Sequence, residues 1–188
     1  MKYKVLITDH DLDNFSEEKR IFKKNNIQLF IDDLKFEDDL IKAGQGMHGL
    51  ISLFFPITKK VINSIDTLKV IGRYGTGVDN IDIDAAKERK IQVVNISDYC
   101  KEEVSNHVLA FILCLNRKTL FFDRYVKEGK WNSSTKLSIE PLRGKILGLI
   151  GFGNIAKEVA QKAHLFGIRT MTYFRNSKCE DMKLYKTE

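Results

Sequence analysis

The sequence predicts an α/β protein, with a parallel sheet in its first hundred residues and a second strand–helix–strand unit near its end. Short apolar runs alternate with helical segments up to about residue 100, which is typical of a parallel sheet covered on both faces. A later apolar run leads into the glycine-rich turn "GFGNIA" and a further helical pattern. A long apolar helix separates the two regions.

The first region is expected to hold five strands and four helices. The strands are predicted at 3–8, 27–31, 49–54, 68–74 and 91–95, and the helices at 16–26, 36–44, 58–65 and 83–90. Thr58 is a suitable N-cap for the third helix. The second unit is predicted as strand 145–150, helix 154–166 ended by Gly167, and strand 168–174.

Two helices are predicted between these regions, at 102–118 and 119–131. Every residue from Val108 to Leu115 is apolar. A helix that is apolar all round is normally buried, so we expect it to lie between two domains. The predicted domains are therefore residues 1–100 and residues 101–188, with both helices in the second.

Composition and charge restrict the function. The chain has 188 residues, 43% of them hydrophobic, and a net charge of +6. Residues 117–188 have 15 basic and 7 acidic residues, a net charge of +8, whereas residues 1–116 have a net charge of −2. The basic excess would suit nucleic acid, an anionic cofactor or a solvated surface. Because no basic-aromatic stripe or zinc-ligand spacing accompanies it, no nucleic-acid partner is expected.

No apolar stretch is long enough to cross a membrane, so no membrane association is expected. The three cysteines, at 100, 114 and 179, are odd in number and far apart. This spacing favours a reducing compartment, so a cytoplasmic location is predicted. No metal site is expected.

The turn after strand 145–150 has the features of a dinucleotide site. Gly151 permits a tight turn, and Gly153 lets a pyrophosphate approach the backbone. Ala156 is small enough for close helix packing, and the amides near Asn154 and Ile155 would face the phosphates. Phe152 completes the turn. The alternative is an ordinary strand–helix turn with packing glycines.

The acidic residue that would bind the adenosine ribose is absent. No Asp or Glu occurs between Val159 and Cys179, and Phe174 stands where the acid is expected. Arg175 follows and would suit a ribose 2′-phosphate. Either the chain uses NADP rather than NAD, or Arg175 is a surface residue at a site that no longer binds.

A second glycine loop follows strand 68–74, in the stretch "GRYGTGVDNID" (72–82). Gly75 and Gly77 free the backbone amides of a loop at the carboxyl end of a strand. Open α/β sheets place their ligands at this edge. Backbone amides in such a loop can hold a carboxylate.

Together these motifs resemble the D-isomer-specific 2-hydroxyacid dehydrogenase family. The resemblance covers residues 1 to about 175 and includes "IQVVNISDYCKEEVSNHVLAFIL" (91–113), "GKW" (129–131) and "LRGKILGLIGFGNIAKEVAQKAHLFGI" (142–168). The segments "DYCKEEVSNH" and "FPITKKVI" are similar to the branch of phosphoglycerate-dehydrogenase-like enzymes and C-terminal-binding-protein corepressors.

The resemblance implies a flavodoxin-like substrate domain over 1–100 and the first βαβ unit of a Rossmann domain. It implies NAD or NADP as cofactor and a small 2-keto or 2-hydroxy acid as substrate. A homodimer is a further expectation, through the region of 119–140 with Trp131. The implied substrate contacts are Phe54, Phe55, Tyr74, Gly75 and Thr76. The implied cofactor contacts are Val104, Gly151, Phe152, Gly153, Asn154, Ile155, Ala156, Phe174 and Arg175.

The sequence departs from the family in three respects. The family's catalytic arginine, its acidic partner and its proton-transferring histidine belong to later segments that are absent, so no catalytic residue is assigned. His10, His48, His107 and His164 are expected to be structural. The segment "SLFFPIT" lacks the basic residue of phosphoglycerate-binding members, which argues against a phosphorylated substrate. The single βαβ unit is expected to leave the apolar faces of "ILGLI" and "MTYF" poorly covered.

Three hypotheses follow. The first is a truncated dehydrogenase of this family, inactive as the 188-residue chain. The second is a non-catalytic dinucleotide-binding or corepressor-like interaction module. The third is a pseudogene product that associates with itself through exposed helices.

Overall fold

The computed structural model describes residues 3–131 and 137–173. The chain divides into two compact units, residues 1–97 and residues 98–188. Both units are built from parallel strands alternating with helices. The α/β fold class predicted from the sequence pattern is therefore confirmed.

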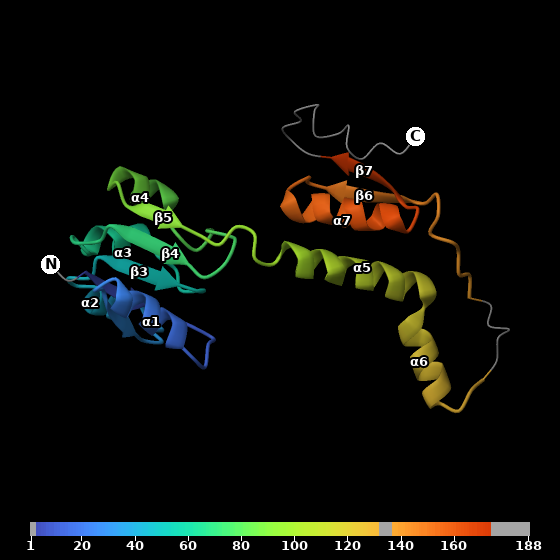
Figure 1. Ribbon diagram of the computed structural model, residues 1–188, viewed down its shortest axis with the longest axis horizontal. Coiled ribbons are helices and arrows are strands. Elements are labelled where there is room, and N and C mark those ends of the chain that lie inside the picture. Colours follow the sequence, from blue (N-terminus) through green and yellow to red (C-terminus); the bar gives the residue numbers. More distant parts are fainter. Residues whose placement is uncertain (1–2, 132–136, 174–188) are drawn as a thin grey trace. The chain divides into compact units, whose positions relative to one another are not determined.

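The first unit is a five-stranded parallel sheet with one helix in each crossover (Figure 1). The strand order is β2-β1-β3-β4-β5, which is the flavodoxin-like order. The elements are β1 (Lys4–Ile7), α1 (Ser16–Lys24), β2 (Gln28–Ile31), α2 (Glu37–Ala43), β3 (Gly49–Ser52), α3 (Lys59–Ser64), β4 (Val70–Arg73), α4 (Ile83–Glu88) and β5 (Gln92–Val94).

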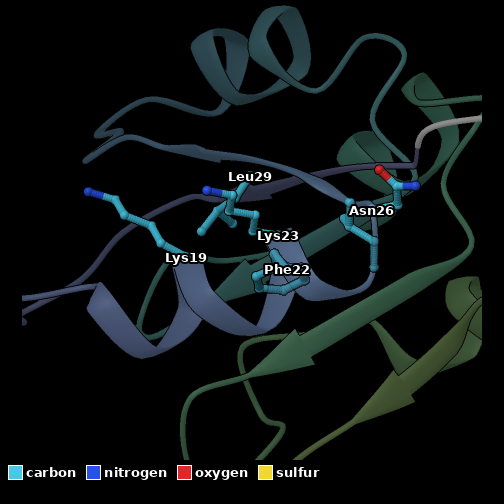
Figure 2. A pocket seen from close by; sticks show the side chains of 6 residues that line it. Lys19, Phe22, Lys23, Asn26 and Leu29 are labelled. Carbon is cyan, nitrogen blue, oxygen red and sulfur yellow. The ribbon is translucent and has the colours of Figure 1, made fainter.

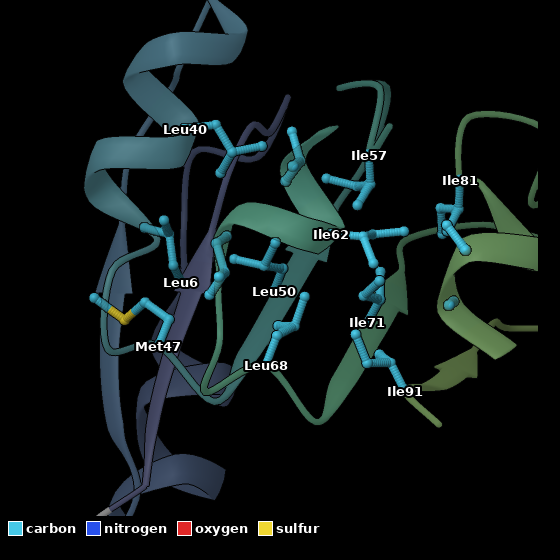
Figure 3. Packing of buried hydrophobic residues seen from close by; sticks show 14 of the residues in the cluster. Leu6, Leu40, Met47, Leu50, Ile57, Ile62, Leu68, Ile71, Ile81 and Ile91 are labelled. Atoms are coloured by element: carbon cyan, nitrogen blue, oxygen red, sulfur yellow. The ribbon is translucent and has the colours of Figure 1, made fainter. Parts of the chain in front are cut away.

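The core of this unit lies between the sheet and helices α2, α3 and α4 (Figure 3). Leu6, Leu50 and Ile71 occupy one row across three neighbouring strands. Leu40 and Ile62 pack onto this row from the helices, and both are fully buried. Burying each such side chain contributes about 1.5–3 kcal/mol. The row fixes the strand register, because a slip of one residue would turn it to the other face.

Side-chain caps set where two of these helices begin. The Thr58 hydroxyl accepts a hydrogen bond from the Val61 amide at 3.3 Å, which confirms the predicted N-cap of α3. Asp82 caps α4 in the same way, through the Ala85 amide at 2.9 Å. These caps satisfy amides that have no acceptor within the helix.

The second unit holds a two-stranded parallel sheet and three helices in its described part. Helix α7 packs against both the sheet and α5, so it forms the middle layer (Figure 1). The elements are α5 (Lys101–Arg117), α6 (Thr119–Lys127), β6 (Ile146–Ile150), α7 (Asn154–Leu165) and β7 (Arg169–Tyr173).

The prediction that the apolar helix is buried all round was wrong. Of the residues of α5, only Ser105 and Leu109 are buried, whereas Phe111 and Leu115 are 58% and 69% exposed. Helix α7 packs against one face of α5, and among the other apolar residues of the helix, Phe111 and Leu115 are exposed whereas Ile112, Leu113 and Cys114 are partly buried. An all-apolar sequence does not show which faces of a helix have a partner.

The predicted exposure of the second sheet is confirmed. Along both strands, exposed residues on one face alternate with partly buried residues on the other. The exposed face carries Ile146, Ile150, Met171 and Tyr173, with Ile150 95% exposed. Among the helices that the structure describes, none is both long and apolar enough to cross a membrane.

Candidate functional site

A buried carboxylate organises the carboxyl edge of the first sheet. Asp9 follows β1 directly, and its two oxygens accept hydrogen bonds from the amides of Leu53, Phe54 and Phe55 at 3.0, 2.6 and 3.0 Å. The Thr8 hydroxyl donates a fourth, at 2.8 Å. Asp9 is 8% exposed. One side chain therefore fixes the loop after β3, on which the two phenylalanines lie.

Burial alone would raise the pKa of the Asp9 carboxyl. The amides of Phe54, Leu53 and Phe55 and the Thr8 hydroxyl favour the charged form more strongly, so the pKa lies below the ordinary 3.8. Asp9 therefore stays ionised at neutral pH. Its hydrogen bonds are charge-assisted and stronger than neutral ones.

Asn80 joins this loop to the loop that follows β4. Its side-chain amide donates to the Ser52 hydroxyl at 3.2 Å and to the Phe55 carbonyl at 3.1 Å. The backbones of Ile57 and Asn80 pair as well, with a hydrogen bond of 2.8 Å. The loops that follow three neighbouring strands of the sheet, β1, β3 and β4, are thus joined by one hydrogen-bond network.

Two of the four backbone amides in the loop over residues 74–77 donate hydrogen bonds to carbonyls of neighbouring residues in the first unit. The Tyr74 amide donates to the Ser52 carbonyl and the Gly75 amide to the Arg73 carbonyl, both at 2.9 Å. Within the described residues, the amides of Thr76 and Gly77 have no acceptor, and both residues are exposed. The predicted carboxylate-binding amides of Tyr74 and Gly75 are therefore already engaged, and the open pair lies one step further along the chain.

Glycine is favoured at position 75, because its φ of +156° is a conformation that other residues rarely adopt. A Cβ atom there would also require the end of the Arg73 side chain to move. The loop is held against β5, because Ile96 donates to the Gly75 carbonyl at 3.0 Å and Asn95 to the Thr76 carbonyl at 2.6 Å.

Arg73 is the residue at this edge that the sequence analysis missed. Its guanidinium lies 5.9 Å from the centre of the Phe54 ring and donates to the Tyr74 carbonyl. Its Nε is buried and has no hydrogen-bond partner among the described residues. The available signal was a charged residue at the end of a buried strand, directly before the glycine loop. Phe54 is 68% exposed, whereas Phe55 is buried.

The Tyr74 side chain contacts α1. Its hydroxyl donates to the Glu18 carboxylate at 3.1 Å. Burial, followed by this carboxylate, raises the pKa of Tyr74 well above its ordinary value, so the hydroxyl stays protonated. Tyr74 therefore anchors the loop and does not act as a proton donor to a ligand.

In the second unit, the glycine turn has an open backbone. Gly151 has a φ of +92°, and its amide donates to the Tyr173 carbonyl at 2.7 Å. A Cβ on Gly153 would meet nothing within 4 Å, although its φ of −80° suits any residue. The fold therefore does not require glycine at 153, which leaves room for a ligand.

The amides at the start of α7 are also free. Helix α7 begins after Gly153 and has no side-chain cap. No acceptor for the amides of Asn154, Ile155 and Ala156 is found among the described residues. Three free amides and the positive end of the helix dipole suit a phosphate group. The residues present therefore fit a dinucleotide pyrophosphate.

Side chains around this turn are arranged in two contacts. Asn154 donates to the Asp98 carboxylate at 3.1 Å, which ties α7 to the segment before α5. Lys157 places its ammonium 5.8 Å from the centre of the Phe152 ring. Val104, on the first turn of α5, is 38% exposed. Phe174 and Arg175 lie outside the described residues, so the assignment of NADP remains a prediction.

None of the four histidines lies on the glycine loop or on the glycine turn. His48 accepts from the Lys4 amide and packs on Tyr3. His10 and His107 each pack edge-on against a phenylalanine of their own segment, and His164 lies in the last turn of α7. The described residues contain no group of three metal-ligating side chains.

A groove of about 420 Å³ lies elsewhere in the first unit, between α1 and β2 (Figure 2). Its lining comprises Lys19, Phe22, Lys23, Asn26, Ile27 and Leu29. Both lysines are exposed, and no buried polar group without a partner is found among these residues. The groove therefore lacks the oriented polar groups of the two glycine segments.

The fold and these two segments define a class of protein. A flavodoxin-like unit has a glycine loop whose open amides suit a carboxylate, and it is followed by a strand–turn–helix unit whose glycine turn suits a pyrophosphate. Residues 5–180 match the family described as D-isomer specific 2-hydroxyacid dehydrogenase, catalytic domain. The chain belongs to this family.

Three similar proteins illustrate the relationship. The chain is 36% identical over 171 residues to D-3-phosphoglycerate dehydrogenase of Sus scrofa, covering 90% of this chain and 31% of that protein. An acyclic imino acid reductase in complex with NADPH and D-Arg is 27% identical, with a TM-score of 0.83 over 93% of this chain and 58% of the other. D-Lactate dehydrogenase of Aquifex aeolicus, complexed with NAD and lactic acid, is 26% identical, with a TM-score of 0.82 over 96% and 54%.

The Asp9 carboxylate should make the stability of the first unit depend on pH. Because its pKa is lowered in the folded state, its contribution is complete above about pH 4 and is lost as pH falls through the folded value. Asp9→Asn should cost about 1–3 kcal/mol at pH 7, since it weakens the hydrogen bonds to three amides, and should reduce the acid-side loss of stability.

Urea denaturation followed through the amide resonances of β1 and β3, between pH 3 and pH 7, measures this effect. Asp11→Asn is the matched control, because Asp11 is exposed. If Asp9→Asn shows the stability and pH profile of the wild type, the carboxylate does not hold the loop.

Proposed function

We propose that the chain carries the substrate-binding domain (residues 1–100) and a dinucleotide-binding unit (residues 101–188) of an NAD(P)-dependent oxidoreductase that interconverts 2-keto acids and D-2-hydroxy acids. The observation that carries this proposal is the open glycine turn in a member of this family. The turn combines a cradle at Gly153 with three free amides at the start of α7.

On the substrate side, the amides of Thr76 and Gly77 are the donors for a carboxylate. Arg73 adds a positive charge to the same loop, where its guanidinium donates to the Tyr74 carbonyl. Phe54 supplies an exposed apolar surface beside this charge. A small, singly charged organic acid fits this combination.

On the cofactor side, residues 151–156 would hold the pyrophosphate and Val104 would contact the nicotinamide. The cofactor would supply the hydride for reduction of the keto carbon. NAD and NADP each accompany a similar protein described above, and Arg175 supports NADP through its charge.

An alternative is a non-catalytic dinucleotide-binding or corepressor-like interaction module. The observation that favours it is the placement of the histidines. His48 contacts Lys4 and Tyr3, His10 and His107 each pack against a phenylalanine of their own segment, and His164 lies in the last turn of α7, so none of them lies on the glycine loop or the glycine turn. The 188-residue chain therefore offers no imidazole for proton transfer at either segment.

Gly153→Val should weaken dinucleotide binding without affecting the fold. The Cβ atom of the new side chain meets no protein atom within 4 Å, and the side chain occupies the space in which the pyrophosphate approaches the backbone. Affinity for NADH or NADPH, measured by calorimetry, should fall at least about ten-fold, a loss of about 1.4 kcal/mol. The melting temperature should be unchanged.

Gly148→Ala is the matched control, since Gly148 lies on β6 and its Cβ would also meet nothing within 4 Å. It should bind like the wild type. Equal affinity in Gly153→Val and Gly148→Ala would contradict a pyrophosphate at the turn.

The 188-residue chain alone should not catalyse the reaction. It binds substrate and cofactor in this proposal but has no imidazole placed to move the proton that accompanies the hydride. Absorbance at 340 nm, with NADH or NADPH and pyruvate, glyoxylate or hydroxypyruvate, should remain constant. Steady oxidation that depends on the keto acid would contradict this prediction.

A further inference from the structure

One lysine connects the two helices that carry the proposed cofactor contacts. Lys162 lies on α7, and its ammonium donates to the Ser105 hydroxyl at 2.6 Å and to the Asn106 side-chain oxygen at 2.7 Å. It also reaches the Glu102 carbonyl at 3.3 Å. All three acceptors lie on the first two turns of α5. The lysine side chain is only 21% exposed.

The charge of Lys162 is balanced within its own helix. Glu158 lies one turn earlier on α7, with a carboxylate oxygen 3.5 Å from the ammonium. A partly buried ammonium is retained only when it is paired and hydrogen-bonded, and this one is. Ser105 is fully buried, and its hydroxyl in turn donates to the Glu102 carbonyl at 2.8 Å.

The hydrogen bonds from Lys162 to α5 hold the turn of that helix on which Val104 lies. Lys162 stands about two turns along α7 from Asn154. The Asp98–Asn154 hydrogen bond is a second contact, at the beginning of both segments. Two polar contacts between α7 and the start of α5 therefore fix the position and the rotation of Val104 relative to the glycine turn. Apolar packing alone would fix these less sharply, because it is not directional.

We propose that Lys162 is a positioning residue for the dinucleotide: it sets the spacing between the pyrophosphate turn and Val104. This inference rests on the proposed function, in which the pyrophosphate lies on the turn and the nicotinamide lies against Val104. The affinity for a cofactor that must reach both the turn and Val104 depends on the contacts of Lys162, whereas the affinity for a ligand confined to the turn does not.

The experiment compares NADH with ADP, which carries the adenosine and the two phosphates but no nicotinamide. Calorimetric affinities are measured for the wild type, Lys162→Met and Lys162→Arg. Lys162→Met keeps the length and apolar character of the side chain and removes the ammonium. Its affinity for NADH should fall about ten-fold, a loss of about 1.4 kcal/mol, because the nicotinamide contact at Val104 is displaced, while its affinity for ADP stays within about two-fold of the wild type. Lys162→Arg should recover most of the NADH affinity.

Lys127→Met is the matched control, because Lys127 is an exposed lysine on α6 that pairs with Asp123 of the same helix. It should leave both affinities unchanged. Hydrogen exchange of the α5 amides around residues 104–106 gives a second readout without a ligand. Exchange there should accelerate in Lys162→Met, while exchange in β6 and β7 stays as in the wild type.

Equal loss of NADH and ADP affinity would show that Lys162 only stabilises the unit, and unchanged NADH affinity would show that it positions nothing; either result overturns the proposal. If the wild type binds neither ligand, the proposed function itself fails. If the wild type binds ADP but not NADH, the turn is correct and the assignment of Val104 is wrong.

Discussion

The carboxyl edge of the first unit depends on a single buried charge. Parallel strands end at the same edge, and the amides of the loops that follow them need acceptors once water is excluded. Asp9 accepts from three such amides in succession, after β3. Ser52 and Asn80 extend this network to the loop after β4. Because these groups satisfy one another, the loop after β4 keeps two amides, those of Thr76 and Gly77, that remain open to a ligand.

In the second unit, open amides result from a helix that begins without a side-chain cap. Helices α3 and α4 begin with side-chain caps, whereas α7 begins after Gly153 and has none. Its first amides thus remain available at the position where the backbone is least covered. The polar side chains of α7 are used instead to hold α5, through Asn154 and Lys162. The open turn is formed by Gly153 and the uncapped start of α7. The contacts of Asn154 and Lys162 determine which part of α5 lies near this turn.

Local signals in the sequence were enough to predict much of this arrangement. The alternation of apolar runs and helical segments predicted every strand and helix that the structure describes, because each depends on the periodicity of neighbouring residues. The Thr58 cap and the glycine turn are local as well. Asp9 and Lys162 could not be found in this way, since they bind partners up to 46 and 60 residues away along the chain. The signal for Arg73 was only a charged residue at the end of a buried strand. The amides of Tyr74 and Gly75 were assigned to a ligand because the sequence does not show which loop amides already have acceptors. The burial of α5 was predicted wrongly for a related reason: an apolar helix can pack on one face only.

The central claim is that two open backbone segments, one in each unit, bind the acid and the dinucleotide. An NMR titration of the 15N-labelled chain with NADH and oxamate, an unreactive analogue of a 2-keto acid, tests it most directly. The account predicts that NADH shifts the amide resonances of Asn154, Ile155 and Ala156, and that oxamate shifts those of Thr76 and Gly77. Shifts confined to the groove between α1 and β2, or no saturable shift at either segment, would contradict it.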